Sequence, residues 1–205
     1  MLAEWKKFEC QNFELRPYVD FSKIYHYSIS DQRNINMCVI CSFVTILEYL
    51  SQINNIDIIN FSKNYIYFNC RENKDENSTI GIKQLMKSIN SYGLKQNVNQ
   101  VPALNFENVE DVNLSFSKIY FTKIPLKIKN LRYKLNISPI LVFVKMYYQN
   151  REYIHAVCFV GYNHKKKYFK YQNSYGKNWN NTGFGRIYYQ ECHRIIKAVS
   201  IEIAI

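Results

Sequence analysis

The chain has 205 residues, of which 47% are hydrophobic and 16% aromatic, which is enough apolar material for the core of one domain. Its net charge of +11 comes from basic residues spread along the sequence, and no nucleic-acid-binding motif accompanies them, so we expect no nucleic-acid partner. No apolar run reaches 18 residues and no signal-like stretch opens the chain, so the sequence predicts neither a membrane span nor export.

The six cysteines follow neither a disulfide framework nor the spacing of a zinc site. We therefore expect free thiols, no bound metal and no cofactor. Free thiols and the missing signal together predict an intracellular location, cytoplasmic or virus-associated, and we expect a monomer. The cysteines stand at positions 10, 38, 41, 70, 158 and 192.

Residues 1–30 are predicted to form an extended lead-in with aromatic anchors. The segment that follows, 31–50, ends in a helix whose apolar residues cover most of its circumference, as in a helix buried in a core. These residues are Val39, Ile40, Phe43, Val44, Ile46, Leu47 and Leu50.

Cys38 stands where this helix is expected to begin. The unpaired N–H groups and the positive dipole end of a helix start favour a thiolate, the nucleophilic form of cysteine. Gln32, six residues earlier, has a side-chain amide that can donate to an oxyanion beside the thiol. A lone cysteine is more often a packing residue, so this interpretation depends on a base and an orienting group further along the chain.

The middle of the chain alternates predicted helices and strands. A charged loop at 71–79 leads to a helix at 82–92 that ends at Gly93. The segment 97–113 is expected to be irregular and 116–124 to be a strand. A basic amphipathic helix at 126–135 follows, with Leu126, Ile128, Leu131 and Leu135 facing inward, and a buried strand at 140–148 comes after it.

A strand pair near the carboxyl terminus supplies the base and the orienting group. Strands at 153–161 and 168–171, joined by a basic turn, place His155 on the first strand and Asn173 at the end of the second. An asparagine oxygen can accept from one imidazole nitrogen and leave the other to face a thiol. This is the arrangement of nucleophilic catalysis with an oriented base.

These motifs together resemble those of the papain-like cysteine peptidases, in the compact form found in bacteria, archaea and some viruses. The resemblance implies that Cys38 is the nucleophile, His155 the base, Asn173 its orienting partner and Gln32 the oxyanion donor. The matching runs are Asp31-Gln32 before Cys38, His155-Ala156-Val157, Val160-Gly161-Tyr162, Asn173-Ser174-Tyr175-Gly176, and Trp179.

The resemblance also implies a substrate-binding edge. It places Thr79, Ile80 and Gly81 beside an extended peptide, and Tyr175 and Trp179 as rings next to the site, with Tyr175 shielding the His155–Asn173 bond from water. The family's tryptophan at this position is tyrosine here.

Two glycines of the family motif are also replaced. Arg33 stands for the glycine after the glutamine, and Asn36-Met37 for the Gly-Ser before the nucleophile. Asn36 is expected to tolerate a positive φ.

The predicted fold is α+β, papain-like and two-lobed, in one domain spanning 1–205. The helical lobe with its central buried helix is assigned mainly to 31–110, and an antiparallel sheet or barrel lobe to 111–205 plus the amino-terminal segment. The predicted function is a cysteine endopeptidase acting on polypeptides. Acyl transfer or deconjugation by the same residues, and a catalytically silent binding protein, stay open as alternatives.

Cys41 is the rival nucleophile, because it is the second cysteine of a C-x-x-C pair. The residue six positions before it is Ile35, which has no side-chain donor. Cys41 is also expected to lie one turn inside the helix, where its N–H is already bonded and burial keeps it a thiol. The sequence therefore favours Cys38.

Overall fold

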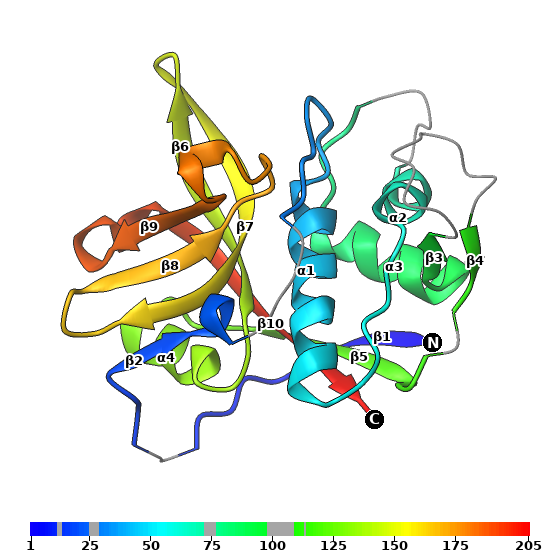
Figure 1. Ribbon diagram of the computed structural model, residues 1–205, viewed down its shortest axis with the longest axis horizontal. Helices are drawn as coiled ribbons and strands as arrows, with labels where there is room; N and C mark the ends of the chain where they lie inside the picture. Colours follow the sequence, from blue (N-terminus) through cyan, green and yellow to red (C-terminus); the bar gives the residue numbers. More distant parts are fainter. Residues whose placement is uncertain (12–13, 25–28, 72–76, 98–108, 113) are drawn as a thin grey trace.

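The computed structural model describes residues 1–205 except 12–13, 25–28, 72–76, 98–108 and 113. A curved sheet and a group of helices lie side by side as two lobes, with α1 standing at their boundary (Figure 1). The helices are α1 (Cys38–Ile53), α2 (Lys63–Cys70), α3 (Ile82–Tyr92) and α4 (Ile128–Leu135), with 3-10 turns η1 (Phe21–Lys23), η3 (Trp179–Asn181) and η4 (Tyr189–Arg194).

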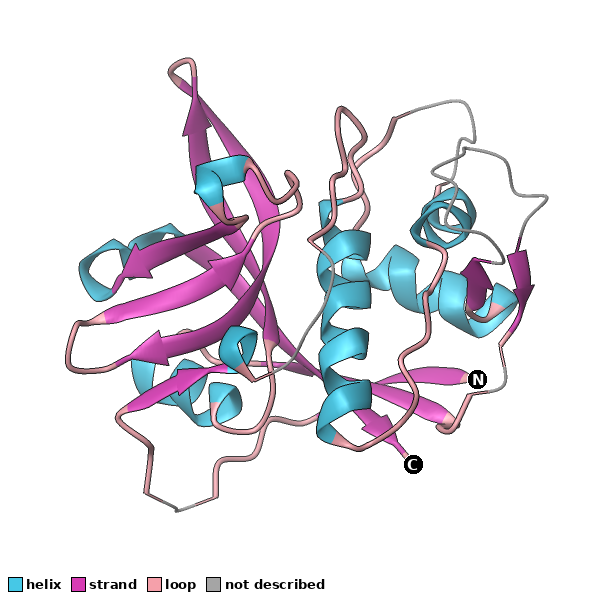
Figure 2. Cartoon of the chain, in the orientation of Figure 1, coloured by secondary structure: helices cyan, strands magenta, loops and turns pink. Residues whose placement is uncertain are grey.

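The main sheet has eight strands in the order β1-β5-β10-β6-β7-β8-β9, and β2 pairs with β7. Among the described strands of this sheet, only the β1–β5 pair is parallel, and the other pairs are antiparallel. The strands β6 to β9 form the sheet lobe, whereas β1 and β5 reach across to the side of the helices (Figure 2). The strands are β1 (Leu2–Lys6), β2 (Tyr18–Asp20), β3 (Lys95–Asn97), β4 (Val109–Asp111), β5 (Lys118–Lys123), β6 (Ile140–Tyr148), β7 (Arg151–Asn163), β8 (Tyr168–Gln172), β9 (Phe184–Tyr188) and β10 (Ile195–Ala204).

The central helix α1 is buried from Cys38 to Ser51. It packs against β7 on one side and α2 on the other, so apolar side chains are needed all round, as the sequence predicts. Burying a helix of this kind at the lobe boundary fixes the position of its first residue, Cys38.

The predicted two-lobed α+β architecture is confirmed, and several element bounds agree closely. The strand β6 spans the predicted residues 140–148, and α3 ends before Gly93, whose φ is 70°. Within the described residues, no helix is long and apolar enough to cross a membrane.

The extended lead-in contains the strands β1 and β2, which pair with the distant β5 and β7. Two local predictions were wrong. The segment 97–113, most of which lies outside the described residues, includes β4, which pairs with β3. Leu126 is 48% exposed because α4 begins only at Ile128, so Leu126 precedes the helix and does not face inward.

Candidate active site

Cys38 is the first residue of α1, and its buried side chain meets the sheet lobe. The backbones of Ala156, Val39 and Cys38 are close enough to its sulfur to favour the thiolate. Because Ala156 follows His155 in β7, this contact brings the thiol against the strand that carries the predicted base. Burial raises the pKa of Cys38, and these backbone groups oppose that rise by stabilising the thiolate. Burial is the larger effect, so the pKa of Cys38 is raised, whereas the sequence predicts that the helix start favours the thiolate.

Cys41 lies one turn further along α1 in a different environment. Its backbone N–H donates to the Met37 carbonyl at 2.9 Å. Burial raises the pKa of its thiol to about 12, so Cys41 stays protonated near neutral pH. These observations favour Cys38 over Cys41 as the reactive thiol.

His155 and Asn173 meet through the β7–β8 hairpin. His155 Nε2 lies 2.7 Å from Asn173 Oδ1, and both side chains are 2% exposed. An amide oxygen can only accept, so Nε2 donates and Nδ1 keeps the lone pair of a base. Burial lowers the pKa of His155, and its bond to Asn173 partly opposes that shift. The imidazole is therefore neutral at pH 7, with its basic nitrogen free of Asn173.

Tyr175 covers the imidazole of His155. The two ring centroids are 4.8 Å apart with planes 19° from parallel. The Tyr175 hydroxyl lies 3.4 Å from His155 Nδ1, and Trp179 packs against the outer side of Tyr175 at 6.4 Å between ring centroids. The ring lies against the base as expected, and it brings to the site a hydroxyl that a tryptophan would not have.

Gln32 is buried beside the strand end that carries Asn173. Its backbone N–H donates to the Ser174 carbonyl at 2.8 Å, and its Oε1 accepts from the Ser174 hydroxyl. Its Nε2 donates to the Ile35 carbonyl at 2.8 Å. An amide nitrogen has two hydrogens, so this contact leaves one for an oxyanion. The side chain is thus fixed at both ends of its amide.

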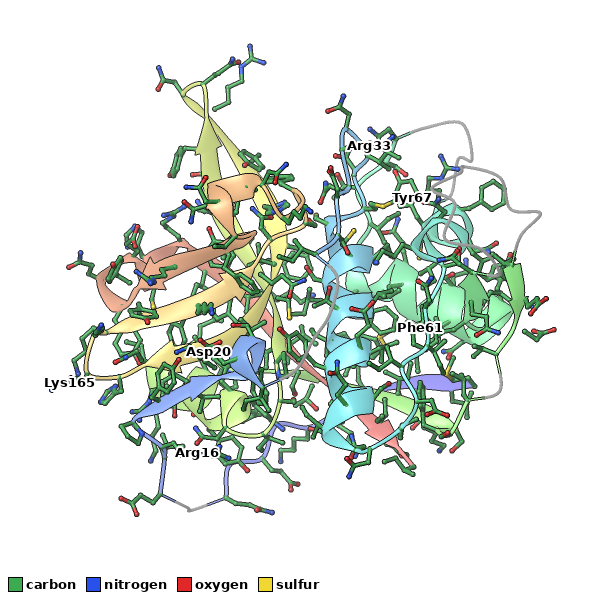
Figure 3. The ribbon with its side chains drawn as sticks, viewed as in Figure 1. Arg16, Asp20, Arg33, Phe61, Tyr67 and Lys165 are labelled. Atoms are coloured by element: carbon green, nitrogen blue, oxygen red, sulfur yellow. The ribbon has the colours of Figure 1, made fainter. Side chains whose placement is uncertain are left out.

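The loop between Gln32 and Cys38 differs from one expectation. The positive φ falls at Arg33 (50°), and Asn36 is not among the described residues with positive φ. A left-handed Arg33 is strained relative to glycine, yet it lies on the exposed face of the loop near the start of α1 (Figure 3). Asn36 instead forms hydrogen bonds with Asn77.

Asn77, which the sequence did not single out, ties this loop to the segment before α3. Its Oδ1 accepts from the Asn36 N–H at 2.7 Å and from the Tyr67 hydroxyl at 3.0 Å. Its Nδ2 donates to the Asn34 carbonyl at 2.8 Å, and its own carbonyl accepts from Asn36 Nδ2 at 2.7 Å. We call Asn34, Asn36, Tyr67 and Asn77 the asparagine clasp. The sequence does not distinguish Asn77 from the other asparagines, because asparagines are abundant in this chain.

The predicted substrate-binding edge is only partly accessible. The Ile80 side chain is 1% exposed and belongs to the core. The Gly81 N–H donates to Gln84 Oε1 at 2.7 Å as part of the start of α3. Thr79 is exposed, so within this trio it is the residue best placed to meet a peptide.

Metal-based chemistry has no obvious site in the described part of the chain. No group of three or more His, Cys, Asp or Glu side chains there is placed to hold a metal ion. The six cysteines are free thiols.

Residues 141–203 match the family model described as papain family cysteine protease. A search of curated protein sequences finds no significant match.

Solved structures of cysteine proteases share the fold. Xylellain, a cysteine protease from Xylella fastidiosa, superposes with a TM-score of 0.72 at 17% identity, covering 93% of this chain and 86% of xylellain. The bromelain protease from Ananas comosus, in complex with the E64 inhibitor, gives 0.73 at 15% identity, covering 93% of this chain and all of the bromelain chain. The Carica candamarcensis protease CMS1MS2 gives 0.70 at 15% identity, covering 90% and 97%.

Proposed function

We propose that this chain, which has a papain-like fold and matches the papain-family model over residues 141–203, is a cysteine endopeptidase that uses Cys38 as its nucleophile. The observation that carries the proposal is the 2.7 Å bond between His155 Nε2 and Asn173 Oδ1. It orients a buried imidazole in β7, where the backbone of the next residue, Ala156, favours the Cys38 thiolate.

Acylation begins from a neutral pair, because burial raises the pKa of Cys38 and lowers that of His155. As the sulfur attacks the substrate carbonyl, the thiol proton passes to His155 Nδ1. The oxyanion then accepts from the Cys38 backbone N–H, which has no intrahelical acceptor at a helix start, and from Gln32 Nε2. His155 gives its proton to the leaving amine as the carbon–nitrogen bond breaks, and an acyl-enzyme remains.

Deacylation repeats these roles with water. His155 Nδ1 takes a proton from the water that attacks the thioester, and the same two donors hold the second oxyanion. When the carbon–sulfur bond breaks, the proton returns to Cys38 and the new carboxylic acid leaves. Asn173 keeps the imidazole orientation through both halves.

The test is covalent labelling with a peptidyl epoxide, followed by mass spectrometry of the digested protein. We expect one stoichiometric adduct on Cys38 in the wild type and none in Cys38→Ala. The wild type should also cleave an unstructured polypeptide at internal bonds. An adduct on Cys41 would overturn the assignment of the nucleophile.

The alternatives give different results in the same assays. A folded protein that forms no adduct and cleaves nothing is a binding protein. Product analysis with an added amine separates hydrolysis from acyl transfer, since both use the same nucleophile and base. Dominant amide products at low amine concentration would indicate a transferase.

A further inference from the structure

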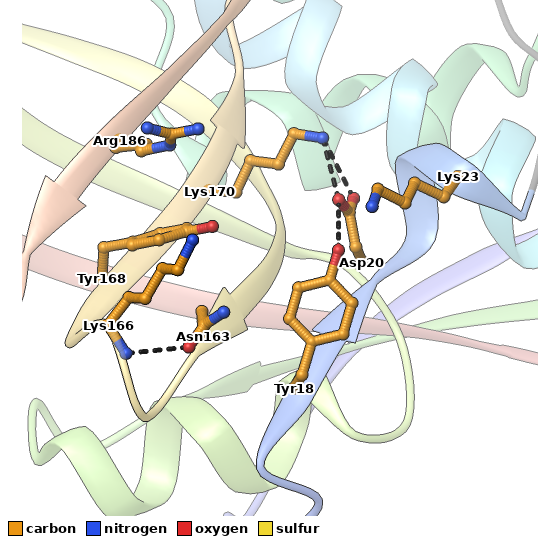
Figure 4. Close-up of a pocket in the computed structure, with 8 residues that line it drawn as sticks. All are labelled: Tyr18, Asp20, Lys23, Asn163, Lys166, Tyr168, Lys170 and Arg186. Atoms are coloured by element: carbon orange, nitrogen blue, oxygen red, sulfur yellow. Dashed lines mark hydrogen bonds and ion pairs between the residues drawn. The ribbon is translucent and has the colours of Figure 1, made fainter.

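The sheet lobe carries a hollowed surface outside the candidate active site. One hollow of about 470 Å³ lies between β2, β8 and the β7–β8 turn (Figure 4). A second, of about 650 Å³, lies against β9 and the residues that follow Trp179. Both are lined by Lys23, Lys170 and Arg186, so the two hollows are continuous. We call this surface the basic groove.

The groove has an excess of positive charge. Lys23, Lys166, Lys170 and Arg186 line the first hollow, and Asp20 is its only acidic lining residue. Asp20 is buried and already accepts from Lys170 Nζ at 3.0 Å. No ion pair among the described residues involves the other three cations. The open part of the groove is therefore strongly basic.

Two of these cations face each other directly across the sheet. Lys170 of β8 is paired in register with Arg186 of β9. Like charges at such directly opposed positions destabilise a sheet. Asp20 relieves only the Lys170 side of the pair, so an anionic group bound in the groove would relieve the Arg186 side.

Three of the four cations also lie over aromatic rings of the groove. Arg186 lies 4.9 Å from the ring centroid of Tyr168, and Lys170 lies 4.6 Å from that of Phe184. Lys23 lies 5.6 Å from the ring centroid of Tyr18. Side chains fixed in this way lose less conformational entropy when they bind a ligand.

The position of the groove connects it with the candidate site. The second hollow is lined by Asn180 and Thr182, which follow Trp179 in the chain. Trp179 packs on Tyr175, which covers His155. The groove therefore begins directly after Trp179 in the chain, whose ring contacts the residue that covers His155.

We propose that the basic groove is a secondary docking site for an acidic segment of the polypeptide substrate, a proposal that rests on the peptidase function proposed above. Aspartate and glutamate side chains would bind Lys23, Lys166 and Arg186 while a neighbouring segment occupies the active site. Substrates would then be selected by acidic residues at a distance from the cleaved bond, in addition to the residues next to that bond.

The kinetic test uses three peptides with one cleavable segment: untailed, or with an Asp/Glu-rich tail placed before or after it. For the wild type we expect an acidic tail in one of the two positions to lower KM by roughly tenfold. Each partly exposed ion pair contributes only a small binding free energy, and several of them add up. Raising the salt concentration should reduce this preference. The triple variant Lys23→Gln/Lys166→Gln/Arg186→Gln should lose the preference and cleave the untailed peptide normally.

A second triple variant controls for net charge. Lys83→Gln/Lys87→Gln/Lys123→Gln removes the same three charges from exposed positions on α3 and β5, and none of these residues lines the groove. It should keep the preference for the acidic tail. If both triple variants lose the preference equally, or if the groove variant keeps it, the docking site is wrong.

A binding measurement makes the test independent of catalysis. The fluorescence anisotropy of a labelled acidic peptide is measured with Cys38→Ala, with and without the three groove substitutions. Weaker binding only with the groove substitutions supports the groove even if no peptide is ever cleaved. Tighter binding of a single-stranded oligonucleotide that displaces the peptide would overturn the proposal in favour of a nucleic-acid site.

Discussion

The two sides of the candidate site are held in place by different means. On the sheet side, His155 belongs to β7 and Asn173 follows β8, so a continuous ladder of backbone hydrogen bonds positions both. On the helical side, Cys38 and Gln32 flank a loop fixed by amide side chains, chiefly those of Gln32 and Asn77. In the sheet, many backbone hydrogen bonds remain when one side-chain interaction is lost. The loop is held by only a few side-chain hydrogen bonds, so losing one of them has a larger effect on its conformation. Single substitutions should therefore disturb geometry more on the helical side.

The largest expected effect is on the nucleophile itself. Cys38→Ala removes the attacking atom and should reduce kcat on the order of a millionfold, as loss of a catalytic nucleophile does. Cys41→Ala is the matched control in the same helix, and should keep most activity while losing at most about 2 kcal/mol of stability. Activity is measured by peptide hydrolysis and stability by denaturant unfolding. Full inactivation by Cys41→Ala with an intact fold would show that the nucleophile is Cys41, one turn further along α1.

Gln32→Ala should have the next largest effect. Removing one oxyanion donor typically reduces kcat on the order of a hundred- to a thousandfold, with little change in KM. Gln52→Ala, which removes a glutamine from the far end of α1, is the control and should change neither value. A large rise in KM at unchanged kcat would show that Gln32 binds substrate and does not stabilise the oxyanion.

Asn173→Ala tests the sheet side of the comparison. The fold should persist because β7 and β8 remain paired, while loss of imidazole orientation should lower kcat by on the order of a hundredfold. The bond to Asn173 raises the pKa of His155, so the acidic limb of kcat/KM should shift to lower pH in this variant. Wild-type turnover in Asn173→Ala would contradict its role.

The asparagine clasp allows an effect on the position of the loop before Cys38 to be separated from an effect on the stability of the fold. Asn77→Ala removes hydrogen bonds to Asn34, Asn36 and Tyr67 and should lower kcat by about tenfold through displacement of the loop before Cys38. Asn90→Ala is the control, because Asn90 bonds the backbone of Ala3 in a similar way, far from the site. Both variants should lose about 1–2 kcal/mol of stability.

Only Asn77→Ala should change turnover. Equal loss of activity in the two variants, after correction for the folded fraction, would show that the clasp acts through stability alone.

The sequence predicted the parts of this molecule whose patterns are local. The helix beginning at Cys38 and the strands around His155 follow from apolar periodicity, and the pairing of His155 with Asn173 follows from a hairpin. The strand β1 could not be predicted because its parallel pairing with β5 joins residues more than a hundred positions apart.

The same limit applied to the site. Asn77 is one of many asparagines, and only the folded chain brings it within 2.7 Å of Asn36. Burial of Cys38 was underestimated for a related reason: the helix start is visible in the sequence, whereas the sheet lobe that covers it is not. Both the contact of Asn77 with Asn36 and the burial of Cys38 depend on residues that are distant in the sequence.

The smallest expected effect concerns Tyr175, which joins the two sides of the site. Its hydroxyl lies 3.4 Å from His155 Nδ1, and a donor to that nitrogen stabilises the neutral imidazole and so lowers its pKa. Tyr175→Phe keeps the stacked ring and removes the donor. The acidic limb of kcat/KM should then shift to higher pH by less than about one unit, with kcat at the optimum nearly unchanged.

Tyr175→Leu, which removes the ring as well, is the comparison that separates shielding from hydrogen bonding. It should expose the His155–Asn173 bond to water and lower kcat, an effect that Tyr175→Phe should not have. The measurement is the full pH profile of kcat/KM and kcat for both variants. If Tyr175→Phe leaves the acidic limb in place, the hydroxyl does not act on the base, and the ring alone accounts for the presence of Tyr175 beside His155.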